Sequence, residues 1–251
     1  MERVFIFLIG LFTGSFLGVL ADRLPRGESV VWGLSHCESC GTPLNWYELI
    51  PVVSYVRQKG KCTHCGKPFS VQYPLVELVT GFGFAYLSGF YLTPLIVFLA
   101  ACTIFSALLV IFIADLKYQI IPDSMIVAGS VGALVIQCFS PTVLPSLLVH
   151  LASAAGSFAF LWALWAVTHG RGMGFGDVKF AALMGLLLGF PSVVVAFYVA
   201  FLTGAAAGVI LILRGRAGLK SKIAFGPFLV GGTVVAFFWS GYILAWWKAV
   251  L

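Results

Sequence analysis

Long, continuously apolar runs dominate this chain, and short polar segments separate them. The runs cover residues 4–20, 75–92, 95–114, 124–139, 144–168, 178–190, 192–213 and 227–247. Most approach the length of about 20 residues that a helix needs to cross a bilayer. They do not alternate with period two, as strands of a membrane barrel do, so each run predicts a helix. The pattern therefore predicts an all-α, polytopic membrane protein with about eight transmembrane helices.

Composition supports the same class. Of 251 residues, 61% are hydrophobic and only 10% are charged, which lies far outside the soluble range. The first run has no separate basic region before it and no clear cleavage site, so we expect a retained span surrounded by membrane lipid. Its small residues Gly10, Gly14 and Gly18 have spacings that favour close helix packing. The run 178–190 is the weakest span, because it is short.

The basic residues predict the orientation in the membrane. They follow spans one, three, five and seven, and only Arg3 and Lys248 fall on the opposite side. The positive-inside rule places the basic side in the cytoplasm and both termini outside. The formal net charge of +6 is then a topology signal, so we expect no nucleic-acid partner. The basic residues are Arg23, Arg26, Arg57, Lys59, Lys61, Lys67, Lys117, Arg171, Lys179, Arg214, Arg216, Lys220 and Lys222.

Residues 22–73 form the one sizeable polar segment and contain two C-x-x-C pairs. The pairs are Cys37 with Cys40 and Cys62 with Cys65, and a glycine follows each pair. Four thiolates on two tight turns suit a tetrahedral structural zinc ion. The segment therefore predicts a small cytoplasmic insertion resembling a zinc ribbon. A disulfide fits less well on the reducing side of the membrane, and thiol redox chemistry or a metal-free segment are the other interpretations.

Two aspartates border apolar runs on the cytoplasmic side. Asp115 ends the run 95–114, and Asp177 follows a glycine-rich stretch and begins the run 178–190. Asp177 taken alone could be a helix N-cap, and Asp115 an ordinary juxtamembrane charge. A carboxylate at the C-terminal end of a helix is disfavoured by the helix dipole, however, so Asp115 needs another explanation. An ionisable group beside a membrane span is by default a candidate for function.

Paired carboxylates suit aspartic-type hydrolysis of a peptide. Like charges a few ångströms apart do not both ionise cheaply, so one carboxyl keeps a proton while the other activates water. The helix ends suggest Asp177 as the base and Asp115 as the proton holder. Asp123 is expected to cap the next helix. Lys117 and Lys179 each lie two positions beyond an aspartate, and they could anchor lipid head groups, orient a substrate or tune the acids.

Glu77 lies about one turn inside the second span, where the helix N-terminus favours a carboxylate. A structural role and a polar contact to substrate or to a second catalytic centre are equally compatible with that place.

An ordered set of motifs extends over most of the chain. They are Gly14-Ser15-Phe16-Leu17, Arg23-Leu24-Pro25, the paired C-x-x-C motifs, Tyr73-Pro74-Leu75-Val76-Glu77, the stretch from Asp115 to Ile121-Pro122-Asp123, and Gly174-Phe175-Gly176-Asp177. Together they resemble the type IV prepilin peptidases of bacterial pilus and type II secretion systems. The Gly-x-Gly-Asp tetrapeptide alone is also found in presenilin-like proteases. The complete ordered set is much more specific.

The resemblance implies a bifunctional membrane enzyme. Asp115 and Asp177 would be its catalytic aspartates, and it would cleave prepilins or pseudopilins after a glycine at the cytoplasmic face of the inner membrane. It would then methylate the new N-terminal residue with S-adenosylmethionine. Residues 1–92 would form the methyltransferase-associated region with the zinc segment, and residues 93–251 the peptidase domain. Family members usually have asparagine where this chain has Gly18, so the methyl transfer is less secure than the cleavage.

Three other functions compete with this one. A presenilin-like protease would share the aspartate chemistry but leave the four cysteines unexplained. A proton-coupled transporter would place its acids near mid-span. A non-catalytic assembly factor would need only the zinc segment.

Overall fold

The computed structural model describes residues 1–30, 32–33, 35–215, 218 and 223–250. Three residues of the basic cluster after the seventh run, Arg216, Lys220 and Lys222, lie outside these ranges.

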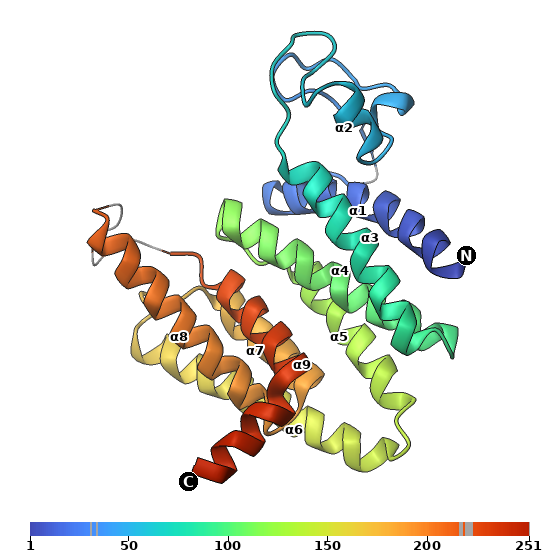
Figure 1. Cartoon of the computed structure of the whole chain (residues 1–251). Coiled ribbons are helices and arrows are strands. Elements are labelled where there is room, and N and C mark those ends of the chain that lie inside the picture. The colour runs from blue at the N-terminus through green and yellow to red at the C-terminus, as the bar shows by residue number, and fades with distance from the viewer. Residues whose placement is uncertain (31, 34, 216–217, 219–222, 251) are drawn as a thin grey trace. The chain divides into compact units, whose positions relative to one another are not determined.

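Helices account for all the regular elements of the described residues (Figure 1). Eight of them are long, and each coincides with one of the apolar runs. These are α1 (Glu2–Arg26), α3 (Gln72–Tyr91), α4 (Leu95–Tyr118), α5 (Asp123–Cys138), α6 (Val143–Val167), α7 (Phe175–Leu188), α8 (Ser192–Leu213) and α9 (Gly226–Val250). A short 3-10 helix η1 (Trp46–Glu48) and α2 (Val53–Arg57) lie in the polar segment. The expected all-α class is confirmed.

Five of these helices, α1, α4, α6, α8 and α9, are long and apolar enough to cross a membrane, counted over the described part of the chain. The helices α3, α5 and α7 are not among them. The chain is thus a polytopic membrane protein, and the count of eight spans stays a prediction.

The chain divides into two compact units, Met1–Ser106 and Ala107–Leu251. In the first unit α1 packs along α3. A side chain at Gly14 would place its Cβ 2.6 Å from the Glu77 Cα, and one at Gly10 would place it 2.7 Å from the Gly81 Cα. The two backbones approach this closely only because the residues are glycines, so the expected small-residue packing of the first span is confirmed.

In the second unit α7 is the central helix. It contacts α5, α6, α8 and α9 and is enclosed by them (Figure 1). Val178, Phe180, Ala181 and Met184 are fully buried, and Leu183 nearly so. A helix that is apolar on every side belongs inside a bundle. Burial among neighbours explains why the apparently weakest span, with only 14 residues, is nevertheless a well-formed helix.

Candidate active site and metal centre

Asp115 lies in the last turn of α4 and is only 5% exposed. Its Oδ2 accepts a hydrogen bond of 2.8 Å from the backbone N–H of Gly226, the first residue of α9. The N-terminus of α9 carries a partial positive charge, which stabilises a carboxylate. The unfavourable position at the end of α4 is therefore compensated by a second helix that starts 111 residues later.

Gly226 is a functional residue that the sequence reasoning missed. A Cβ at this position would lie 2.7 Å from the Asp115 Oδ2 and 2.9 Å from its Cγ. Only glycine allows the amide to come so close to the carboxylate. The available signal was Gly226-Pro227 at the start of the last apolar run, on the side of the membrane to which the sequence assigns both aspartates.

Asp177 is the third residue of α7 and is 6% exposed. Its Oδ2 accepts a hydrogen bond of 3.0 Å from the backbone N–H of Gly174, the N-cap residue. The carboxylate thus satisfies one of the free amides at the start of its own helix. Both aspartates consequently face a helix N-terminus, so the helix-end argument no longer distinguishes a base from a proton holder. That division of roles stays a prediction.

The connection between α4 and α5 packs directly on the start of α7. A Cβ at Gly176 would lie 3.1 Å from the Ile121 Cβ, and Ile121 is 8% exposed. Gly176 therefore has a packing role, since a larger residue would push this connection away. The contact holds the segment after Asp115 against the segment that carries Asp177.

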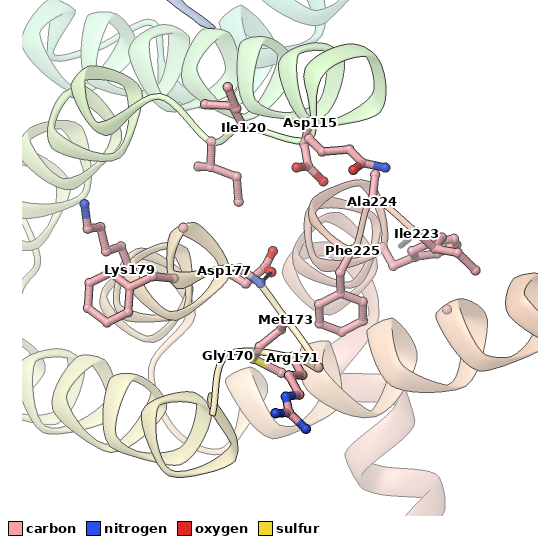
Figure 2. Close-up of a pocket in the computed structure, with 18 of the residues that line it drawn as sticks. Asp115, Ile120, Gly170, Arg171, Met173, Asp177, Lys179, Ile223, Ala224 and Phe225 are labelled. Atoms are coloured by element: carbon pink, nitrogen blue, oxygen red, sulfur yellow. Dashed lines mark hydrogen bonds between the residues drawn. The ribbon is translucent and has the colours of Figure 1, made fainter. Parts of the chain in front are cut away.

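Both carboxyl groups border one cavity of about 780 Å³ (Figure 2). Figure 2 shows them pointing into the same space from different helices, with Phe225 on one side and Arg171 at the edge. The structure thus brings the two candidate aspartates together, while their catalytic role stays a prediction. The other lining residues are Gln119, Ile120, Ile121, Asp123, Gly170, Gly172, Met173, Gly174, Phe175, Gly176, Lys179, Phe201, Gly204, Ile223, Ala224 and Phe228.

Asp123 does not cap α5, so that expectation was wrong. Pro122 is the N-cap residue, and Asp123 is the first residue of the helix, without a capping hydrogen bond from its side chain. Its two oxygens instead accept hydrogen bonds of 2.8 and 2.7 Å from the Lys179 ammonium. Asp123 therefore binds a charged partner on α7 and not a backbone amide at the start of its own helix.

The four cysteines of the polar segment converge. The Sγ atoms of Cys37, Cys40, Cys62 and Cys65 all lie within 4.8 Å of one another. A tetrahedral zinc ion with Zn–S distances of about 2.3 Å would set its sulfurs about 3.8 Å apart. The Cys37 and Cys65 sulfurs are 3.9 Å apart, so this donor set fits a zinc ion.

The two cysteine pairs lie on nearly identical turns. The N–H of Gly41 donates to the Cys37 carbonyl at 2.8 Å, and that of Gly66 to the Cys62 carbonyl at 2.9 Å. Both glycines have φ of 70°, a conformation that side chains disfavour. The sequence spacing alone therefore determines the local geometry of each pair.

Two glutamates stabilise this segment: Glu48 bonds within it, and Glu77 connects it to α3. Glu48 is buried and accepts hydrogen bonds from the Asn45 backbone and the Thr63 hydroxyl. These bonds, the one from Thr63 above all, hold the pKa of the Glu48 carboxyl below its usual value. Glu77 accepts the backbone N–H of Val52 at 2.7 Å, which supports the structural interpretation of that residue.

Two family models match the chain. The model of the bacterial peptidase A24 N-terminal domain matches residues 8–91, and that of the type IV leader peptidase family matches residues 102–209.

Curated relatives match over nearly the whole chain, and each is named prepilin leader peptidase/N-methyltransferase. The protein of Bacillus subtilis (strain 168) is 32% identical, over 96% of this chain and 96% of its own length. That of Burkholderia pseudomallei (strain K96243) is 31% identical, over 97% of this chain and 88% of its own. That of Myxococcus xanthus (strain DK1622) is 35% identical, over 87% of this chain and 66% of its own. No solved structure matches the chain significantly.

Proposed function

Because this chain belongs to the type IV leader peptidase family, we propose that it is a membrane aspartic endopeptidase that removes the leader of type IV prepilins or pseudopilins. The observation that carries the proposal is the pair of buried carboxyl groups, Asp115 and Asp177, that border one cavity. The names of the relatives extend the proposal to a second activity, methylation of the new N-terminal residue with S-adenosylmethionine as methyl donor.

The chemistry follows from two carboxyls that share one proton. The ionised carboxylate accepts a proton from water while the water oxygen attacks the peptide carbonyl carbon, and the protonated carboxyl donates its proton to the carbonyl oxygen. The tetrahedral intermediate then breaks its C–N bond, and the leaving nitrogen takes a proton from the carboxyl that had accepted one. One hydroxyl of the intermediate gives its proton to the other, now ionised, carboxylate as the new carboxylic acid forms, which restores the starting state of the pair. The N-terminal amides of α7 and α9 stabilise the ionised forms of Asp177 and Asp115.

The four-cysteine cluster would hold a structural zinc ion. Four thiolates complete a tetrahedral shell and leave no coordination position open for a substrate. The ion would fix the fold of the segment between α1 and α3, and Cys37, Cys40, Cys62 and Cys65 are its proposed ligands.

The proposed location is the inner membrane, with the aspartate pair and the four-cysteine segment on the cytoplasmic side and both termini outside. The distribution of basic residues supports this sidedness, since Arg3 and Lys248 are the exceptions. The three alternative classes, a presenilin-like protease, a transporter and an assembly factor, fit the chain less well. Each leaves either the cysteine cluster or the paired aspartates without a role.

Cleavage is tested with purified protein and a prepilin in detergent. The Asp115→Asn and Asp177→Asn variants should each lose leader removal, because neither single carboxyl can both hold and accept the proton. Glu2→Gln is the matched control, since Glu2 is an exposed carboxylate at the other end of the chain. Leader removal at an undiminished rate by either aspartate variant would show that the mechanism is wrong.

Methylation is tested separately by mass spectrometry of the cleaved product's N-terminus. With S-adenosylmethionine present, the product should gain one methyl group, and without it none. An unmethylated product in both reactions would restrict the proposal to the peptidase. A Gly18→Asn variant then examines whether the family's usual residue at this position restores the transfer.

A further inference from the structure

Lys179 and Asp123 form a two-pronged ion pair at the edge of the cavity. The Lys179 Nζ lies 2.8 Å from Asp123 Oδ1 and 2.7 Å from Oδ2. Lys179 belongs to the first turns of α7, two residues after Asp177, and Asp123 is the first residue of α5. The pair therefore joins the two helices next to the aspartate site.

The lysine is also held from its other side. Its ammonium lies 5.6 Å from the centre of the Phe175 ring, and this ring packs edge-on against Trp165 at 5.3 Å. The end of α6, the start of α7 and the start of α5 are thus connected in one series of contacts. A cation between a carboxylate and an aromatic face has a defined position rather than a free side chain.

Stability does not explain this arrangement. The side chains of Lys179 and Asp123 are 38% and 66% exposed, and exposed ion pairs contribute little to folding. Its place on the connection between α4 and α5 is more informative. That connection, residues 119–122, follows the last turn of α4, which contains Asp115. This part of the chain is fixed at Asp115 by Gly226, at Ile121 by Gly176, and at Asp123 by Lys179.

We propose that Asp123 and Lys179 are positioning residues that hold the α4–α5 connection on α7 and so set the distance between the Asp115 and Asp177 carboxyls. This inference rests on the proposed peptidase function. Without the ion pair, the connection keeps the apolar contact of Ile121 with Gly176 but loses its charged attachment to α7, and Asp115 can move away from Asp177. A displacement of about 1 Å in a catalytic constellation costs about 100-fold in rate.

The test compares single and exchanged charges in prepilin cleavage. Asp123→Asn and Lys179→Met should each lower kcat by about 10- to 100-fold with little change in KM, because the carboxyl pair is misplaced while the substrate still binds. Lys179→Arg should retain most activity. The double variant in which the two charges are exchanged, Asp123→Lys with Lys179→Asp, should recover at least half of the loss in log kcat that the single variants show. Lys248→Met, which removes an exposed lysine at the far end of α9, is the control and should leave the rate unchanged.

The outcomes separate this inference from the alternatives. Full activity of Asp123→Asn and Lys179→Met would overturn it. A raised KM in Lys179→Met, together with wild-type kcat and KM in Asp123→Asn, would overturn the inference as well, because this result would assign the lysine to substrate binding.

Hydrogen exchange of the amides in residues 119–126 supplies a readout that needs no substrate. Exchange should be faster in Lys179→Met than in the wild type, and equal exchange would contradict the positioning role. A wild type that does not cleave any prepilin, with faster exchange in the variant, would instead refute the proposed function and leave the ion pair's positioning role supported.

Discussion

The four-cysteine segment and the aspartate cavity are built in opposite ways. The cysteine ligands lie between residues 37 and 65, on two similar turns that each contain their own glycine and backbone hydrogen bonds. The cavity instead takes Asp115 from α4, Asp177 from α7, and the amide that holds Asp115 from α9, 111 residues along the chain. The first site is formed by one short segment, whereas the second needs a packed bundle.

This difference determines what each site is sensitive to. The described part of the cysteine segment buries few apolar side chains, and Trp32, Trp46 and Val56 are exposed, so its order should depend on the four cysteines. The aspartate cavity depends on close backbone contacts, and substitutions far from the carboxyls in the sequence should alter it.

Removal of the metal should have the largest effect and remain confined to the cysteine segment. Binding of a structural zinc ion to such a site contributes about 10–16 kcal/mol, far more than the segment's other contacts. A strong chelator, or Cys37→Ser, should therefore make residues 27–71 sensitive to protease while the helices of the second unit stay resistant. Limited proteolysis with mass spectrometry, together with metal analysis giving one zinc per chain, checks this. Digestion of both units at equal rates would contradict their independence.

Gly226→Ala should impair the aspartate site strongly. The added Cβ would lie 2.7 Å from the Asp115 Oδ2, so either the carboxylate or the start of α9 must move. We expect a loss of about 100-fold in kcat for leader removal. Gly231→Ala is the matched control, because it lies in the same helix and a Cβ there meets nothing within 4 Å. Equal activity of the two variants would show that the contact between Gly226 and Asp115 is unimportant.

Gly176→Ala should have a smaller effect, because the new Cβ would meet its neighbour at a longer distance than in Gly226→Ala. It would lie 3.1 Å from the Ile121 Cβ, so the connection must shift by a few tenths of an ångström. We expect a loss of about 10-fold in kcat, and partial recovery with Ile121→Ala, which removes the Cγ1 and Cδ1 atoms that would lie 3.5 and 3.7 Å from the new Cβ and so lets the connection settle again. Steady-state kinetics of the single and double variants measure the coupling. If the two substitutions are simply additive, the glycine has some other role.

Glu48→Gln should weaken the cysteine segment modestly. Because the pKa of Glu48 is lowered in the folded segment, its carboxylate stabilises the segment at every pH above the usual glutamate value of about 4.3. That contribution is lost only as the pH falls further, through the lowered pKa. At neutral pH the variant should lose about 1 kcal/mol, seen as roughly five-fold faster zinc release to a chelator. The ratio of the zinc release rates of the variant and the wild type should stay constant from pH 7 to pH 5. A ratio that approaches one within this range would contradict the lowered pKa of Glu48.

The local features of the fold could be predicted because local patterns determine them. All eight apolar runs are helices, and the glycines after Cys40 and Cys65 have the positive φ that a turn around a metal requires. Asp123 was predicted as a cap because neighbours in sequence are the only partners that such reasoning can see. Its partner is Lys179, 56 residues away on another helix.

Residue types and their spacing are sufficient to predict the membrane class, the helices, the cysteine pairs and the choice of Asp115 and Asp177 as candidates. Each of these depends on residue type and spacing over a few turns, where local sterics and hydrophobicity dominate. The burial of α7 at the centre of its unit, the hydrogen bond from the Gly226 amide to Asp115 and the pairing of Lys179 with Asp123 are apparent only in the folded chain. Those contacts join segments from different helices, and they form only when packing brings the helices together.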